Sequence, residues 1–377
     1  MESASEDALA SLREQVAAAD RQGRPLTIRG GGTKGFYGRP ALSPEDGAGH
    51  PDDATDPAQV LDCRSNRGVI NYEPTELVIS ARCGTTLEEI ESILAANRQY
   101  LPFEPPHFGD GATLGGMVAA GLSGPRRMAA GALRDYVLGT TLLTARADVL
   151  RFGGQVMKNV AGYDVSRLLA GSLGVLGVIA EVSLKVLPLP VAEQTLQFDC
   201  DQTESIRLCN QWGGQPLPIS ATLWHEERLS VRLSGARAAV DAAAARLGGE
   251  RLPAPEAQAL WLSVREQTHD FFADAGVLWR LSLPSATPPL VLTGRQLIEW
   301  GGALRWYVPL HDHAPAQSVR DLVGSLGGSA TLFRASPRAS VERFHPLEDT
   351  VRQIHQRLKR EFDPNRILNP GRMYDWL

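Results

Sequence analysis

The apolar pattern in the first half of the chain predicts short strands alternating with helices. Helical spacing of Leu9, Leu12 and Val16 predicts a helix over residues 7–20. The T-x-x-E sequence that begins at Thr85 is typical of a capping box and predicts the start of another helix. Asp164 is expected to cap a third, short helix that ends before a glycine. Strands are expected over residues 25–28, 68–72, 76–82 and 175–187.

The pattern changes after Pro188 and Pro190, which we take as a domain boundary. Beyond it, strands are expected over residues 229–233, 277–283, 303–308 and 331–333, and helices over residues 236–247 and around 319–326. Strands and helices that alternate in short units favour a ferredoxin-like α+β layer. No internal repeat is evident in the sequence. The predicted division is a first domain over 1–190, an α+β cap over 191–340 and a C-terminal helix and tail over 341–377 that return to the first domain.

Composition excludes several classes of protein. The 38 Lys and Arg residues are outnumbered by 43 Asp and Glu residues, so a basic surface for nucleic acid is not expected. No apolar run reaches the roughly 18 residues of a transmembrane helix. The start of the chain is acidic and polar, unlike a signal peptide. The cysteines do not have metal-site or iron–sulfur spacing, so we expect four free thiols in a cytoplasmic protein, namely Cys63, Cys83, Cys200 and Cys209.

A glycine-rich loop, Arg29-Gly-Gly-Gly-Thr-Lys34, follows the strand expected over residues 25–28. Its G-x-G-x-x-G spacing is that of a dinucleotide site, which needs a helix directly after the glycines. The continuation Phe36-Tyr-Gly-Arg-Pro40 cannot form that helix. The loop instead exposes backbone N–H groups beside Arg29 and Lys34, which predicts a cradle for a phosphate group. The alternative is a glycine-rich turn without a ligand.

Two further segments suggest close backbone contacts. Residues 111–124 carry no charge and contain five glycines, so they are expected to lie against a large flat group or to form a buried piece of core. Thr113 and the paired glycines after it could open a short helix aimed at an anion. In the segment 158–179, glycines recur at every third position from Gly171 to Gly177. That spacing lets the backbone lie against a ring system or against another backbone.

These three segments together resemble the FAD domain of the vanillyl-alcohol oxidase and p-cresol methylhydroxylase (PCMH) type. The order and spacing of Arg29-Gly-Gly-Gly-Thr-Lys34, Thr113-Leu-Gly-Gly116 and Gly171-Ser-Leu-Gly-Val-Leu-Gly-Val-Ile179 match that family. The resemblance implies an α+β fold with a two-part PCMH-type FAD-binding domain. It also implies dissociable, non-covalent FAD, with the pyrophosphate at residues 30–34. The cofactor-binding residues that we expect are Arg29, Gly30, Gly31, Gly32, Thr33, Lys34, Thr113, Leu114, Gly115, Gly116, Ser123, Gly124, Lys158, Asn159, Gly162, Tyr163, Gly177, Val178 and Ile179.

Longer phrases resemble the E-type FAD-binding subunits of bacterial glycolate oxidases, also called glycolate dehydrogenases. They include Phe103-Glu-Pro-Pro-His-Phe-Gly109 and Arg134-Asp-Tyr-Val-Leu-Gly139, and the resemblance extends over nearly the whole chain. It implies a flavin-binding subunit of a complex that oxidises glycolate, a small 2-hydroxy acid, to glyoxylate. The implied partners are a sister FAD subunit and an iron–sulfur subunit that receives the electrons. The complex is expected in the cytoplasm, and attachment to a membrane through its partners is left open.

The catalytic residues remain unknown from the sequence. The His-x-Gly-Asp-Gly-Asn-x-His stretch of catalytic relatives is missing from the second domain; the sister subunit is expected to carry it. The sequence His107-Phe-Gly-Asp-Gly111 imitates its first half but lies in the predicted FAD domain. His311 and His313 form an H-x-H pair without a third ligand, so no metal site is expected. Two alternatives stay open: a stand-alone FAD oxidoreductase on another hydroxy acid or alcohol, which would need a base and an anion-binding Arg in the cap, and a non-catalytic electron-relay or assembly subunit.

Overall fold

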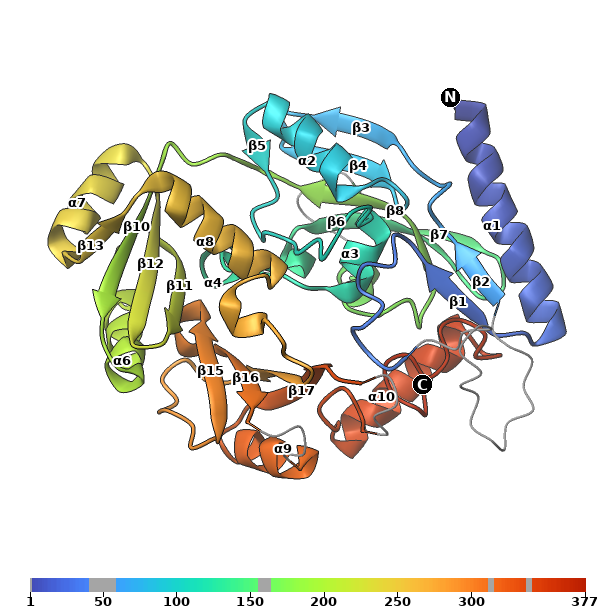
Figure 1. Cartoon of the computed structure of the whole chain (residues 1–377). Helices are drawn as coiled ribbons and strands as arrows, with labels where there is room; N and C mark the ends of the chain where they lie inside the picture. The colour runs from blue at the N-terminus through green and yellow to red at the C-terminus, as the bar shows by residue number, and fades with distance from the viewer. Residues whose placement is uncertain (1, 41–58, 155–163, 311–314, 337–340) are drawn as a thin grey trace.

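The computed structural model describes residues 2–40, 59–154, 164–310, 315–336 and 341–377, and within them two sheets lie side by side (Figure 1). The smaller sheet is antiparallel and five-stranded, and every strand in it comes from the first 190 residues. Its strand order is β3 (Val69–Glu73), β4 (Val78–Arg82), β8 (Val178–Lys185), β6 (Val137–Leu143) and β7 (Val149–Gly153). The strand expected over 175–187 is shorter than predicted, because a turn in which the Val175 N–H donates to Ser172 O precedes it.

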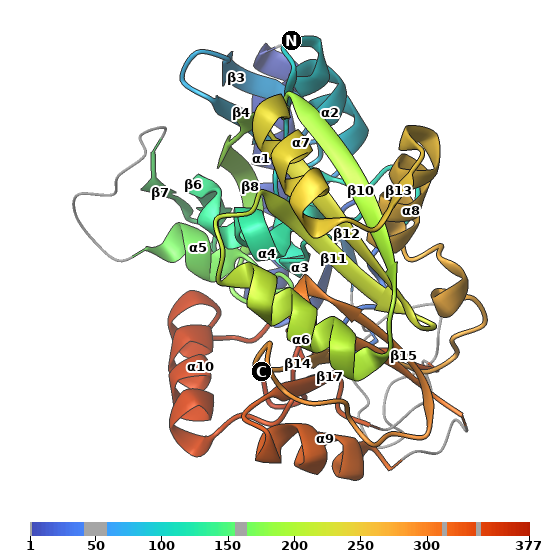
Figure 2. The same ribbon diagram turned by 90° about the vertical axis from the view of Figure 1, so that its left-hand side faces the viewer.

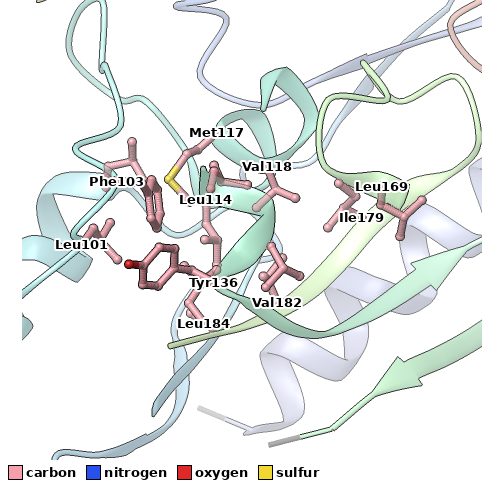
Figure 3. Close-up of a cluster of buried hydrophobic side chains, with 14 of the residues drawn as sticks. Leu101, Phe103, Leu114, Met117, Val118, Tyr136, Leu169, Ile179, Val182 and Leu184 are labelled. Atoms are coloured by element: carbon pink, nitrogen blue, oxygen red, sulfur yellow. The ribbon is translucent and has the colours of Figure 1, made fainter. Parts of the chain in front are cut away.

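Two helices cover one face of this sheet and form its core with it (Figure 3). They are α2 (Leu87–Ala96) and α3 (Leu114–Ala120). The side chains of α2 that the sequence pattern placed inward are fully buried. The capping prediction was wrong by one residue, because the side chain of Thr86 accepts from the N–H of Glu89 while Thr85 accepts from the N–H of Gly68. Asp164 does cap the short helix α5 (Val165–Leu169), as predicted.

A second layer holds the chain ends against the smaller sheet. Helix α1 (Glu2–Gln22) packs on the parallel strand pair β1 (Leu26–Arg29) and β2 (Gln59–Asp62). The segment after α10 (Asp349–Phe362) lies beside β1, where the Leu26 N–H donates to Ile367 O over 2.6 Å. The Lys359 ammonium is buried in this layer and donates to Asp363 and to the carbonyl oxygens of Val175 and Leu368.

The larger sheet is antiparallel and eight-stranded, and it contains a repeat that the sequence did not reveal. Each half contributes four strands, which we number 1 to 4 along the chain. Read from the outer edge of the sheet inward, both halves have the ferredoxin-like order 4-1-3-2, and they join between β11 and β15. In the second half a loop replaces the first helix. The order is β13 (Glu250–Leu252), β10 (Ala192–Asp199), β12 (Arg228–Gly235), β11 (Ile219–His225), β15 (Gly294–Glu299), β16 (Leu304–Pro309), β14 (Leu278–Ser282) and β17 (Ser329–Arg334).

Helices flank this sheet, as the view turned by 90° shows (Figure 2). They are α6 (Gln202–Gly213), α7 (Arg237–Leu247), α8 (Ala254–Glu266) and α9 (Ala316–Ser325). The remaining elements are short: β5 (Gln99–Tyr100), α4 (Arg127–Ala130), η1 (Leu133–Asp135), β9 (Leu187–Pro188), η2 (Asp270–Phe272) and η3 (Trp300–Gly302). The four cysteines are free, as expected. None of the helices in the described ranges combines the length and apolar character needed to cross a bilayer.

Candidate functional site

The glycine-rich loop after β1 lies directly against the loop that precedes α3. A Cβ atom on Gly30 would lie 2.3 Å from Thr113 Oγ1, and one on Gly31 would lie 1.8 Å from the carbonyl oxygen of Gly111. These distances are far inside van der Waals contact, so both positions require glycine. The two loops that the sequence predicted as cofactor-binding are therefore brought together by backbone contact.

This loop leaves several donors free and has a cation beside them. Within the described residues, the N–H groups of residues 31–34 donate to no protein acceptor. The Lys34 ammonium donates to His107 O over 3.1 Å and lies 3.3 Å from Thr33 Oγ1. Burial lowers the pKa of Lys34 from its ordinary value to about 8, and the charge of Glu266 opposes that shift. Free N–H groups beside an ammonium form a site for an anion.

Arg372, from the C-terminal segment, fixes the other side of the loop. Its guanidinium donates to Gly35 O and Tyr37 O, each over 2.7 Å, and also to Arg39 O. These bonds satisfy the carbonyl oxygens and anchor the segment that follows the free N–H groups. Arg29, at the end of β1, has its guanidinium 3.2 Å from the position of a Cβ atom on Gly32.

The second predicted segment forms a helix, but the helix start does not offer donors to an anion. Thr113 caps α3 by accepting from the N–H of Gly116. The N–H groups of Leu114 and Gly115 donate to Thr85 O and Cys83 O. The expectation of an anion at this helix start is therefore wrong, because its first donors are already used by the protein.

The other predicted glycines approach protein rather than open space. Cβ atoms on Gly115, Gly124 and Gly177 would lie 2.7 Å from the Cβ of Cys83, 2.4 Å from the carbonyl oxygen of Glu104 and 2.5 Å from the side chain of Leu142. The side chains of Val178 and Ile179 belong to two separate hydrophobic clusters. Only the backbone of this segment is left to contact a cofactor. Lys158, Asn159, Gly162, Tyr163, His311 and His313 lie outside the described residues.

A small pocket separates this region from the larger sheet. Its cavity volume is about 30 Å³, and its mouth is open to solvent. Ser123 and Gly124 line one side, and Arg280 of β14 and Glu299 of β15 line the other. The Gly124 carbonyl oxygen accepts from the Trp300 indole over 3.1 Å, which ties the two sides together. The sequence pattern did not identify either charged residue, although a carboxylate directly after the apolar pair Leu297-Ile298 of β15 is an unusual feature when it is buried.

Glu299 is the buried acid of this pocket. Its side chain is 4% exposed and accepts from the Trp306 indole over 2.7 Å. Burial raises the pKa of Glu299 to about 7, although the hydrogen bond from Trp306 and the charge of Arg280 oppose the shift. The carboxylate can therefore gain or lose a proton near neutral pH.

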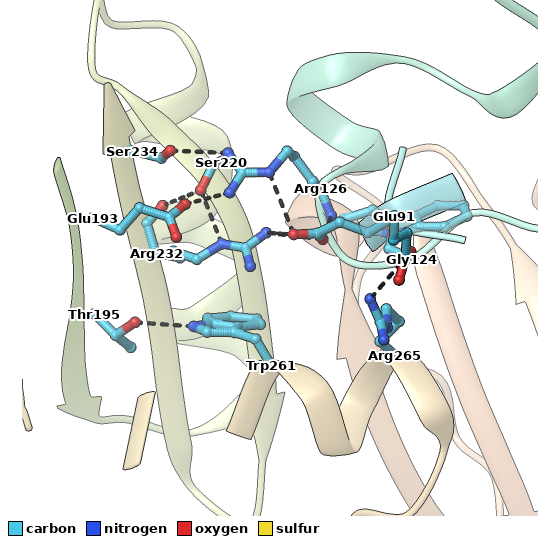
Figure 4. A network of polar contacts seen from close by, with 12 residues as sticks. Glu91, Gly124, Arg126, Glu193, Thr195, Ser220, Arg232, Ser234, Trp261 and Arg265 are labelled. Carbon is cyan, nitrogen blue, oxygen red and sulfur yellow. Dashed lines mark hydrogen bonds and ion pairs between the residues drawn. The ribbon is translucent and has the colours of Figure 1, made fainter. Parts of the chain in front are cut away.

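An ion network joins the two sheets beside the pocket, and its two arginines, Arg126 and Arg232, are buried (Figure 4). Glu104, from the side of the smaller sheet, is 2.9 Å from Arg232 of β12 and 3.3 Å from Arg126. Arg126 also pairs with Glu193 of β10. Burial alone would raise the pKa of Glu104, but Arg232 and Arg126 outweigh it and hold the pKa below its ordinary value. No group of histidine, cysteine or carboxylate side chains within the described ranges could hold a metal ion.

Comparison with known proteins places these features in context. Residues 7–153 match a family model described as an FAD binding domain. The chain is 46% identical over 97% of both chains to glycolate oxidase subunit GlcE of Escherichia coli K12. It is 33% identical to glycolate oxidase subunit GlcD of Bacillus subtilis 168, over 34% of this chain and 27% of that protein. The solved structure of an alkyldihydroxyacetonephosphate synthase superposes with a TM-score of 0.65 at 16% identity, covering 95% of this chain and 74% of that one, which shows a shared fold.

The residues at the site fit an FAD molecule. The free N–H groups of residues 31–34 and the Lys34 ammonium suit a doubly charged pyrophosphate. The nearby pocket places aromatic walls, which include Trp306 and Phe333, beside the uncharged backbone of Gly124.

Proposed function

The chain belongs to the family of the glycolate oxidase subunit GlcE, and from this premise we propose that it is the FAD-binding subunit of a complex that oxidises glycolate to glyoxylate. The observation that carries the proposal is 46% identity over 97% of both chains, because the match extends over nearly the whole length of each. The free donors beside Lys34 support it independently, because they provide the anion site that FAD needs.

Each part of the site has a role in this proposal. The N–H groups of residues 31–34 and the Lys34 ammonium hold the pyrophosphate. The segment from Gly111 to Gly116 packs against that loop and fixes its position. Ser123 and Gly124 lie along the flavin, at the pocket. The bound flavin supplies the acceptor for the hydride removed from the hydroxy acid. The protein contributes orientation, the exclusion of water and the electrostatic environment.

The proposal extends to partners and location. We propose a sister FAD subunit similar to GlcD and an iron–sulfur subunit that takes the electrons onward. The domain division at residues 1–190, 191–340 and 341–377 remains part of the proposal. Four free thiols suit a reducing compartment, and we propose that the complex works in the cytoplasm, held at a membrane through its partners if at all.

The test is an absorption spectrum of the purified full chain, recorded before and after anaerobic addition of glycolate. Flavin bands in the purified chain are the expected result. A chain that purifies colourless and takes up no added FAD would contradict the proposal and favour an assembly subunit. Flavin bands that bleach with glycolate assign substrate oxidation to this chain, whereas bands that persist until the sister subunit is added assign it an electron-relay role.

A further inference from the structure

We propose that the pocket between Gly124 and the larger sheet is a binding site for a small 2-hydroxy acid on this chain itself, with Arg280 holding the carboxylate and Glu299 accepting the hydroxyl proton. The inference rests on the proposed function, because it assigns the substrate to the same flavin site. It goes further in giving this chain its own oxidation chemistry although the histidine stretch of catalytic relatives is missing.

Arg280 is a cation without an anion. Within the described part of the chain, its guanidinium has no carboxylate at ion-pair distance and lies over the Trp300 ring, 5.2 Å from the centroid. Arg127 lies over the same ring at 4.4 Å, so two guanidinium groups share one indole. Burial and the charge of Arg280 both lower the pKa of Arg127. An anion bound in the pocket beside Arg280 would offset the repulsion between the two guanidinium groups. A carboxylate suits this position because its two oxygens match the planar guanidinium.

Glu299 is placed for proton transfer. Trp306 holds one carboxylate oxygen, so the orientation of the group is fixed. The next residue, Trp300, adopts a left-handed backbone with φ +53, which is strained for a bulky side chain. Its indole donates to Gly124 O, and that bond holds Glu299 against the segment predicted to line the flavin. The charged groups that face Glu299 are Arg280 on β14, Glu104 from the smaller sheet's side and Arg265 on α8.

The reaction balances with the groups present and the bound flavin. The hydroxyl proton goes to the Glu299 carboxylate. With FAD bound, the hydrogen on the hydroxyl carbon would leave with its electron pair to the acceptor that the flavin supplies, and that carbon would become a carbonyl. The walls formed by Leu122, Val264 and Phe333 are apolar and close, so the pocket favours an acid with a small side chain.

The experiment measures binding and chemistry separately on the full chain carrying FAD. Isothermal titration with oxalate reports the carboxylate site, and anaerobic stopped flow with glycolate reports flavin reduction. Arg280→Met is expected to weaken oxalate binding about 10- to 100-fold, and Arg280→Lys less. Glu299→Gln is expected to keep oxalate binding and to slow flavin reduction by about 100-fold or more. Reduction in the parent is expected to accelerate as the pH rises through about 7, where Glu299 loses its proton, and this dependence should vanish in Glu299→Gln.

Arg134→Met is the matched control, because Arg134 also acts on the charge of Arg127 but does not line the pocket, and its side chain is 67% exposed. It should leave both measurements unchanged. Failure of the parent chain to bind oxalate would overturn the inference, and so would loss of FAD in Arg280→Met, which would assign Arg280 to the cofactor. Either result leaves the proposed function standing, because that proposal depends on flavin in the parent chain.

Discussion

The two walls of the pocket are built differently. On the side of the smaller sheet, uncharged backbone segments approach so closely that Gly31 and Gly124 have no room for a Cβ atom. On the side of the larger sheet, charged side chains such as Arg232, Glu299 and Arg305 are buried almost completely. The first arrangement offers free N–H groups and a closely packed backbone, which suit the proposed cofactor. The second provides the groups that can bind an anion or move a proton.

The largest loss of stability is expected at the ion pairs that join the two regions. Glu104→Gln keeps the shape of the side chain but leaves Arg126 and Arg232 without their shared carboxylate. Breaking a buried pair in this way costs about 3–5 kcal/mol of unfolding free energy. Denaturant unfolding followed by circular dichroism measures the loss. Since the pKa of Glu104 is lowered, the contribution is present above the ordinary carboxyl pKa and disappears as the pH falls through the lowered value.

The exposed pair of Arg228 with Asp199 on the larger sheet supplies the comparison. Its atoms are 3.6 Å apart and its side chains are 57% and 88% exposed. Asp199→Asn should change stability by no more than about 0.5 kcal/mol. Equal losses from Asp199→Asn and Glu104→Gln would mean that burial of charge does not hold the two regions together.

A somewhat smaller effect is expected from the backbone contact. Gly31→Ala places a Cβ atom 1.8 Å from Gly111 O, so one of the two loops must move. Overpacking of this kind costs about 1–3 kcal/mol, and the shift should also release FAD, because the free donors lose their arrangement. Flavin absorbance per mole of purified chain and thermal unfolding measure the two consequences. Gly213→Ala is the control, since a Cβ atom there meets nothing within 4 Å; retained flavin in Gly31→Ala would remove this loop from the cofactor site.

Features that depend on the local sequence could be predicted. Helix α2 was predictable because Leu87, Ile90 and Leu94 follow a strong helical period. Its cap was placed one residue early, because Thr85 and Thr86 carry the same cap chemistry and only the fold of the preceding strand decides between them. The glycine-rich loop was also predictable, because three consecutive glycines, Gly30 to Gly32, favour a loop over a helix or a strand.

Other features depend on topology and were not predictable. A glycine at every third position suits contact with a ring or with another chain segment, and the structure places Gly177 against Leu142. Arg280 and Glu299 stand on strands that flank β16 from opposite sides. Their approach follows from the strand order of the larger sheet, and no local spacing encodes that order. The duplicated strand order was invisible in the sequence for the same reason.

The smallest effect is expected from the titration of Lys34, the one ammonium beside the free donors of residues 31–34 in the described part of the chain. A pyrophosphate favours the protonated ammonium, whose pKa in the free protein is about 8. FAD affinity should therefore be full below pH 8 and fall about tenfold between pH 7 and pH 9. Lys34→Met should bind FAD about 10-fold more weakly at pH 7 and show a flat profile, whereas Lys34→Arg, which does not titrate in this range, should keep a flat profile with stronger binding. Fluorescence quenching of added FAD gives the affinities. If the parent and Lys34→Met lose affinity in parallel as the pH rises, the titrating charge that holds the cofactor is not Lys34 and lies elsewhere in the protein.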